Sequence, residues 1–216
     1  MGTAERRERE KERRRNTIMK AAKKLFFKKG LENTTMDEIA EKAELGKGTL
    51  YLYFPSKEIL AMSIIKNTSD QLNKALRKAS DTDKSGIERI IDVTQALTDF
   101  FRNRREEFRF FRYMDSITAS LGTGNNILLD WKTEIEDLIQ VVLTVVVEGI
   151  KDGSIRKDIE PAKAAFIYSN MVLSFLIRLS SNHGVILMAQ ELSEDEIIES
   201  MFKMIIKMLE SRESAE

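Results

Sequence analysis

The chain has 216 residues, ample for one or two domains with a hydrophobic core, and 42% of them are hydrophobic while 32% are charged. It has no cysteine, which excludes disulfides and thiolate metal sites, and its single histidine, His183, argues against a histidine metal centre or a Ser-His-Asp triad. The net charge of zero conceals a division, because residues 1–57 hold 15 Lys and Arg against 9 Asp and Glu, and the remainder holds 20 against 26. A basic first quarter on an acidic remainder is typical of a DNA-binding head on a body that does not bind DNA.

Nothing in the sequence directs the chain to a membrane. Its first residues are rich in Arg and Glu and lack the apolar stretch of a secretory signal. The longest apolar run, 141–147, is interrupted by Thr144 and is too short to span a bilayer. We therefore expect a cytoplasmic protein with no membrane partner. Because the carboxylates follow solvated helix faces and no nucleophile is paired with a base, we expect neither an enzyme nor a cofactor.

Residues 5–15 are almost all charged and have no apolar face. One interpretation is a solvated helical extension with Glu–Arg pairs four residues apart. The other is a basic arm that follows the DNA backbone or enters the adjacent minor groove. Residues 16–29 then predict an amphipathic helix, with Ala22 and Phe26 on its apolar face and Gly30 at its end.

The stretch 33–59 predicts two short helices joined by a tight turn and followed by a third helix. Thr34 and Thr35 can cap the first helix with a hydroxyl. Its apolar residues recur at helical spacing: Met36, Ile39, Ala40 and Ala43. Pro55 ends the second helix, and Ser56 caps the third.

The second of these helices, residues 47–54, is too short and too polar to serve packing alone. Leu50 and Phe54 lie one turn apart and face inward. The side chains left outside carry hydroxyls and a charge: Lys47, Thr49, Tyr51 and Tyr53. This pattern indicates a helix-turn-helix whose second helix contacts phosphates and presents its first turn to base edges in the major groove. The alternative is a helical hairpin whose tyrosines only cover the surface.

The same stretch resembles the DNA-binding domain of the TetR family of bacterial and archaeal transcription regulators. The resemblance covers roughly residues 16–62 and rests on Ala21, Ala22, Leu25, Phe26 and Gly30, on residues 34–40, and on GKGTLYLYFPSKEIL from Gly46 to Leu60. In one departure, Glu44 stands where the family often has glycine. If the backbone there is left-handed, a residue other than glycine costs about 1 kcal/mol.

The resemblance implies roles in DNA binding for eight residues. They are Lys47 and Thr49 for base edges, Tyr51 and Tyr53 for phosphates or sugars, Thr35 and Lys57 for backbone phosphates at helix N-termini, and Asp37 and Gly48 close to the backbone.

In the rest of the chain, the apolar residues recur at the spacing of α-helices. The helix that begins at Ser56 continues to a polar break at 80–86 and would connect head and body. Five further helices are expected at 87–101, 106–121, 127–150, 161–181 and 193–210. We therefore expect an all-α chain of about nine helices. A three-helix head with a helix-turn-helix would occupy residues 1–62, of which 1–15 are the basic extension. A helical ligand-binding and dimerisation body would occupy 63–216.

Aromatic and methionine side chains on the body helices could converge on an apolar cavity. The candidates are Phe108, Phe111, Met114, Trp131, Phe166, Tyr168, Met171 and Phe175. A filled aromatic core explains the same residues. The TetR resemblance implies instead that the body binds a small-molecule effector, which this composition suggests is hydrophobic or amphipathic.

The last two helices carry apolar faces that suit a four-helix homodimer interface, with two helices from each chain. The candidates are Leu179, Met201, Ile205 and Met208. Burial inside a single chain is the alternative. The sequence thus predicts a homodimeric, ligand-responsive repressor that binds double-stranded operator DNA. The competing interpretation is a helical small-molecule-binding or scaffolding protein without sequence-specific DNA binding.

Overall fold

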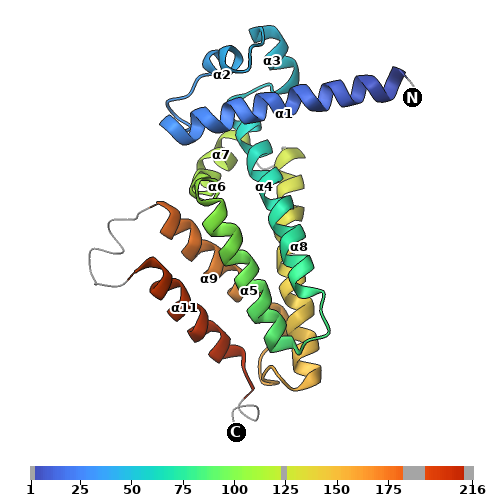
Figure 1. Cartoon of the computed structure of the whole chain (residues 1–216), viewed down its shortest axis with the longest axis vertical. Coiled ribbons are helices and arrows are strands. Elements are labelled where there is room, and N and C mark those ends of the chain that lie inside the picture. Colours follow the sequence, from blue (N-terminus) through green and yellow to red (C-terminus); the bar gives the residue numbers. More distant parts are fainter. Residues whose placement is uncertain (1–2, 123–125, 182–192, 212–216) are drawn as a thin grey trace. The chain divides into compact units, whose positions relative to one another are not determined.

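The computed structural model describes residues 3–122, 126–181 and 193–211, which form helices joined by loops (Figure 1). The helices are α1 (Thr3–Lys29), α2 (Met36–Lys42), α3 (Lys47–Tyr53), α4 (Lys57–Ser80), α5 (Gly86–Asn103), α6 (Arg105–Phe111), α7 (Met114–Leu121), α8 (Asn126–Asp152), α9 (Pro161–Ser181) and α11 (Glu194–Leu209). The only β-pairing within these ranges is an isolated bridge between Ile155 and Glu210. The all-α class is confirmed. Residues 106–121 differ from expectation, because the helix is divided into α6 and α7 at Arg112 and Tyr113.

The chain divides into two compact units, and each is described by itself. The first contains Met1–Thr68 and Tyr113–Trp131, and the second contains Ser69–Arg112 and Lys132–Glu216. The first unit therefore extends beyond the expected boundary at residue 62. His183 and most of the glycine-rich turn at 122–126 lie outside the described residues.

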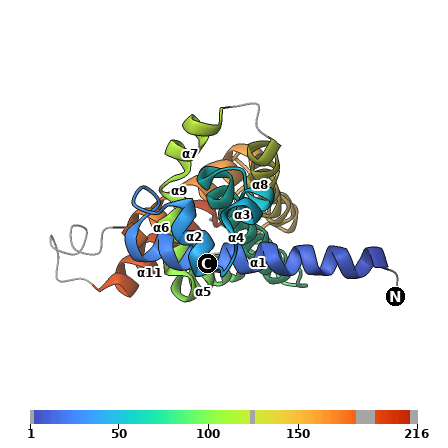
Figure 2. The same cartoon turned by 90° about the horizontal axis from the view of Figure 1, so that it is seen from above.

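The first unit places α1, α2 and α3 around one small core. Helix α1 packs on α2, and α2 packs on α3. The apolar faces predicted from the sequence are buried: Ile18, Ala21, Ala22, Phe26, Met36, Ile39, Ala40, Leu50 and Phe54. Helix α1 is continuous from Thr3, so the charged stretch 5–15 is a helical extension. Figure 2 shows the N-terminal part of α1 extending past α2 and α3.

The turn between α2 and α3 has the left-handed residue that the sequence comparison anticipated. Glu44 has a φ of 56°. Its N–H donates to the Glu41 carbonyl at 3.0 Å, and the N–H of Leu45 donates to the Ala40 carbonyl at 3.0 Å. These two bonds form a Schellman motif, which satisfies carbonyls at the end of α2. The motif keeps the turn tight although a residue with a Cβ occupies the position that favours glycine.

The second unit packs α5, α9, α11 and parts of α4 and α8 around a larger apolar core. The start of α5 approaches α8 at two glycines. A Cβ on Gly86 would lie 2.2 Å from the Gly149 Cα, and a Cβ on Gly149 would lie 2.6 Å from Cδ1 of Ile155. At Gly86 only hydrogen fits, because the nearest atoms are backbone, whereas a Cβ at Gly149 would displace the Ile155 side chain; the two glycines thus allow α5 and α8 to approach closely. Pro161 opens α9, as the sequence predicts.

Candidate nucleic-acid interface and body sites

Helix α3 is anchored by two buried side chains and exposes the rest. Leu50 and Phe54 are wholly buried, whereas Lys47, Gly48 and Tyr51 are exposed. A Cβ at Gly48 would have no neighbour within 4 Å, so this part of the helix surface is open to close approach by a ligand. The outward face of α3 therefore has the shape and chemistry that contact with a nucleic acid requires.

Leu52 is a feature of this face that the sequence reasoning did not single out. Its side chain is 85% exposed. Its position could have been found from the helical period, because two residues along a helix correspond to a rotation of about 200°. That rotation places Leu52 opposite the buried Leu50. The exposed face thus combines a cation, hydroxyls, an aromatic ring and one aliphatic side chain.

An ion pair joins the first turns of α2 and α3. The Lys47 Nζ lies 2.5 Å from the Asp37 Oδ2, and both side chains are more than half exposed. An exposed pair of this kind contributes at most about 1 kcal/mol to stability. Its main effect is to orient the Lys47 ammonium. Asp37 therefore lies at the candidate interface through its contact with Lys47.

Thr35 is fully engaged in capping α2. Its hydroxyl accepts a hydrogen bond from the Glu38 N–H at 3.3 Å, and the Glu38 carboxylate accepts from the Thr35 N–H at 2.9 Å. Lys29 of α1 pairs with the same carboxylate. The Lys29 hydrogen bond, followed by those of Thr35, lowers the pKa of Glu38 to about 2. This network fixes the start of α2 against α1.

Lys57 lies at the start of α4 and bridges back to the loop before α2. Its Nζ donates to the Thr34 carbonyl at 3.0 Å and to the Glu32 carbonyl at 3.3 Å. An ammonium has three N–H donors, so one remains for a phosphate. The Ser56 hydroxyl accepts from the Ile59 N–H at 3.2 Å, which is the cap expected from the sequence. Tyr53 and Thr49 are half-buried at the edge of the exposed face.

The eight residues predicted to line a ligand pocket do not share one environment. In the second unit, Phe108 is fully buried and makes an edge contact with Phe101 at 5.2 Å and a tilted contact with Phe111 at 5.8 Å. Phe175 is half-buried against the same core. In the first unit, Met114 is buried and Trp131 is half-buried.

Phe166 and Met171 differ from the rest of that set, because they lie 55% and 44% exposed on the outer side of α9. Both side chains therefore lie at the surface of α9, where Met171 lines an open groove. The period of α9 brings apolar residues to more than one face, and only the packing decides which face turns inward.

Tyr168, another residue predicted to line the cavity, is paired through its hydroxyl within the core. Its hydroxyl lies 2.5 Å from the Thr94 hydroxyl of α5. Burial raises the Tyr168 pKa to about 12, although the bond with Thr94 opposes that shift. The pair satisfies both hydroxyls in an apolar environment, where an unpaired hydroxyl would be costly.

An apolar groove of about 280 Å³ runs along α9 and α11. It is lined by Ile159, Glu160, Lys163, Ala164, Ile167, Tyr168, Met171, Ile205, Met208 and Leu209. Apolar side chains near it are exposed to solvent: Phe166, Ile167, Met171, Met204 and Met208.

The four residues predicted to form a dimer interface differ in how deeply they are buried. Leu179 and Ile205 are buried in the core of their own chain, although Ile205 also lines the groove. Met201 is half-buried against that core, and Met208 is 59% exposed. Of the four predicted residues, only Met208 is strongly exposed on the apolar face.

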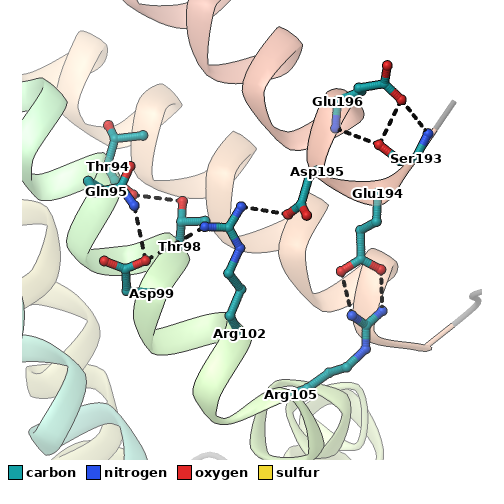
Figure 3. A network of polar contacts seen from close by, with 10 residues as sticks. All are labelled: Thr94, Gln95, Thr98, Asp99, Arg102, Arg105, Ser193, Glu194, Asp195 and Glu196. Atoms are coloured by element: carbon teal, nitrogen blue, oxygen red, sulfur yellow. Dashed lines mark hydrogen bonds and ion pairs between the residues drawn. The ribbon is translucent and has the colours of Figure 1, made fainter.

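Two arginines hold the start of α11 in place (Figure 3). Arg105 donates to both oxygens of Glu194, at 2.5 and 2.8 Å, and to the Leu179 carbonyl at 2.9 Å. Arg102 donates to Asp195 at 2.6 Å. The carboxylates lie in the first turn of α11, where the helix dipole favours negative charge. These contacts fix α11 relative to α5, α6 and the end of α9.

The chain is similar in sequence to known transcription regulators. Residues 18–64 match the family model described as bacterial regulatory proteins, tetR family. An uncharacterised HTH-type transcriptional regulator of Bacillus subtilis, YhgD, is 25% identical over 79% of this chain and 86% of its own length. The HTH-type transcriptional repressor KstR2 of Mycolicibacterium smegmatis is 24% identical over 68% of this chain and 70% of its own. The HTH-type transcriptional activator FasR of that organism is 29% identical over 50% of this chain and 49% of its own.

Solved structures extend the similarity over nearly the whole chain. A tetR-family regulatory protein from Rhodococcus RHA1 superposes with a TM-score of 0.70 at 19% identity, covering 92% of this chain and 97% of the other. The ketosteroid transcriptional regulator KstR2 of Mycobacterium tuberculosis does so with a TM-score of 0.64 at 18% identity, covering 92% and 96%. At such identities the structures establish a shared fold. Together with the family model and the relatives, they characterise a transcriptional regulator with a DNA-binding head, not an enzyme.

Among the helices that the structure describes, one is long and apolar enough to resemble a membrane span. It is α9, and 39% of its apolar window is buried inside the chain. A core helix of a soluble protein meets the same criteria, and α9 has both a buried face and an exposed apolar face. Its composition is explained by packing on one side and an unpartnered surface on the other.

Proposed function

This chain belongs to the TetR family of transcriptional regulators, and we propose that it is a homodimeric repressor released from its operator by a hydrophobic or amphipathic effector. The proposal rests on one observation above all. Helix α3 is anchored by Leu50 and Phe54 and turns a polar and aromatic face outward. We propose a cytoplasmic location, where such a head would meet DNA.

We assign the start of α3 to base edges in the major groove. Lys47, oriented by Asp37, and Thr49 supply donors and acceptors there. Gly48 allows the backbone of α3 to approach the DNA closely. Leu52 adds an aliphatic contact suited to a thymine methyl group.

Phosphate contacts would flank this region and set the register of the head on the duplex. We assign them to Tyr51 and Tyr53 of α3, to the N–H groups that begin α2 after Thr35, and to the remaining donor of Lys57. Helix N-termini favour anions because their N–H groups point outward. The exposure and the hydrogen-bonding groups of these residues support the assignment of phosphate contacts.

The exposed apolar faces of α9 and α11 support self-association through a four-helix arrangement. Met171 and Met208 border the groove, and Phe166 and Met204 extend the apolar surface beside it. An exposed apolar surface of this extent commonly marks a protein–protein interface. Two-fold pairing would also double the DNA contact, because a single short helix reads few base pairs.

We place effector binding in the body, next to the aromatic cluster. Phe108 and Tyr168 are enclosed, so entry would be beside the half-buried Phe111 and Phe175. The aromatic side chains there would suit an apolar effector.

Helix α4 offers a route by which effector binding could reach the head. It is a single helix, with residues up to Thr68 in the first unit and from Ser69 in the second. A tilt of this helix would change the separation of two heads, which must match major grooves about 34 Å apart. The effector must bind one separation more tightly than the other, because only differential affinity can shift the equilibrium.

A fluorescence-anisotropy titration on the chain's own upstream intergenic DNA tests this proposal, with a scrambled duplex as control at physiological salt. Lys47→Ala should reduce the preference for the operator by about 1–3 kcal/mol, as loss of a good base contact does. The matched control is Lys42→Ala, an exposed lysine at the end of α2. An operator preference unchanged in Lys47→Ala would contradict the assignment of α3 as the reading helix.

A further inference from the structure

The N-terminal half of α1 is ordered as a helix without contributing to the core. Its first buried side chain is Ile18, and within residues 4–17 only Glu10 and Arg15 are half-buried. Seven of the 15 Lys and Arg in residues 1–57 lie between Arg6 and Arg15. The extension therefore presents charge and buries little apolar surface.

Arg15 anchors the extension to the rest of the first unit. Its guanidinium lies 4.5 Å from the centre of the Phe54 ring, and it donates to the Ser63 hydroxyl at 3.0 Å. Because Arg15 is directed inward, its neighbours on the helix are held at fixed positions. Arg13 and Arg14 thus stand at defined places beside the head.

A hollow of about 350 Å³ opens between α1 and the turn that precedes α3. It is lined by Glu10, Arg13, Arg14, Thr17 and Leu45. The Arg14 Nε donates to Glu10 at 3.0 Å, and the Arg13 Nε lies 3.5 Å from the same carboxylate. Each guanidinium has more N–H donors than one shared carboxylate can accept. The hollow thus has donors and positive charge in excess.

The hollow lies on the side of the head that carries α3. Leu45 lines it and is two residues before Lys47, the first residue of α3. The Arg14 pKa is raised first by its hydrogen bond to Glu10, then by the Glu10 charge and by Tyr53 at the end of α3. Arg14 of the hollow and the candidate phosphate contact Tyr53 are therefore within electrostatic reach of each other.

We propose that this hollow binds a phosphate of the DNA backbone beside the major groove that α3 enters. Arginine is suited to this role, because its planar fork of donors matches phosphate oxygens. Water occupies about 30 Å³ per molecule in the liquid, so the hollow has room for a phosphate and its hydration. Glu10 holds both guanidinium groups in position before DNA arrives. This inference rests on the proposed function. The phosphate contact would add affinity and help to set the register of the head on the duplex, but it would not distinguish one base sequence from another.

The salt dependence of DNA binding tests the inference. Arg13→Ala with Arg14→Ala should flatten the slope of log Kobs against log salt by about 0.9, the value for one phosphate contact. Between about 50 and about 200 mM salt, the variant would lose about threefold less affinity than the wild type. Arg6→Ala with Arg7→Ala removes the same charge from the same helix and is the matched control, with a smaller change expected. Circular dichroism would verify that both variants keep their helix content.

A duplex with single methylphosphonate substitutions locates the contact. The wild type should lose affinity at one flanking phosphate in each half-site, and the Arg13→Ala/Arg14→Ala variant should be insensitive at that position. Equal slopes for the two double variants, or no slope change in either, would overturn the inference. The slope is measured on the operator and on the scrambled duplex, since a phosphate contact serves both. A wild type that prefers neither duplex would count against the proposed function, while the slope comparison would still decide whether the hollow binds phosphate.

Discussion

Helix α3 in the head and helices α9 and α11 in the body all turn large side chains outward, but they expose different chemistry. On α3 the exposed face mixes the Lys47 ammonium, the Tyr51 ring and the single aliphatic Leu52. On α9 and α11 the exposed large side chains include Phe166, Ile167, Met171, Met204 and Met208. A mixed polar and aromatic surface suits phosphates and base edges, whereas an apolar surface suits another protein face. This difference supports the proposal that α3 contacts DNA and that α9 and α11 mediate self-association.

The largest expected effect comes from placing charge on the apolar face of the body. Met171→Glu with Met208→Glu should dissociate the dimer and weaken operator binding at least about 100-fold, because the two heads would no longer bind as a linked pair. Sedimentation and anisotropy measure the two effects. Lys203→Glu, on another side of α11, should leave both unchanged. A double variant that remains dimeric would remove α9 and α11 from the interface.

The next effect concerns packing inside the body. Gly86→Ala should destabilise the chain by about 2 kcal/mol, because its Cβ would overlap the backbone of Gly149. Thermal or urea unfolding measures the loss. Gly46→Ala is the control, since a Cβ there meets no atom within 4 Å. If Gly86→Ala were as stable as Gly46→Ala, α5 and α8 would not approach each other closely at Gly86 and Gly149.

A smaller effect of opposite sign is expected in the head. Glu44→Gly should stabilise it by about 1 kcal/mol, because glycine adopts the left-handed backbone at this turn without strain. Glu41→Gly, inside α2, should instead destabilise the head by about 1 kcal/mol. Urea unfolding of both variants gives the comparison. A shift of the same sign in both would show that backbone strain at Glu44 is not the cause.

The smallest effect is a dependence of head stability on pH. The pKa of Glu38 is about 2 in the folded chain, lowered first by the hydrogen bond from Lys29 and then by Thr35. Because this pKa is lowered, ionised Glu38 stabilises the folded head fully at pH values above its pKa in the unfolded chain. That stabilisation is lost as pH falls from about 4.5 to about 2. In Glu38→Gln and in Lys29→Met, the free energy of unfolding should therefore fall less steeply with decreasing pH in that window, as urea unfolding at several pH values would measure. Curves that parallel the wild type would show that this network does not contribute.

The helices of the head were predictable because several local signals agree. The spacing of Leu50 and Phe54, the cap at Thr35 and the stop at Pro55 all act over a few residues, so the sequence shows them directly. The strained turn at Glu44 could also be anticipated, through the TetR resemblance. Leu52 could have been placed on the exposed face by the same period.

Other features depend on residues that are distant in sequence. Lys57 bonds to carbonyls of Glu32 and Thr34, more than 20 residues earlier, and no local pattern reveals that. In α9, apolar residues occur on two faces, so the period could not tell that Leu179 would be buried while Met171 remained exposed. Which face turns inward is decided by the partners of the helix.

The most direct test of the central claim is selection of bound sequences from a pool of randomised duplexes. If the protein is a homodimer with one recognition helix per chain, the selected motif should be two-fold symmetric, with half-sites about one helical turn apart or a multiple of it. The enriched duplex should bind two protomers or a multiple of two. Enrichment of no sequence, or of a single element without symmetry bound by one chain, would contradict the proposed dimeric regulator.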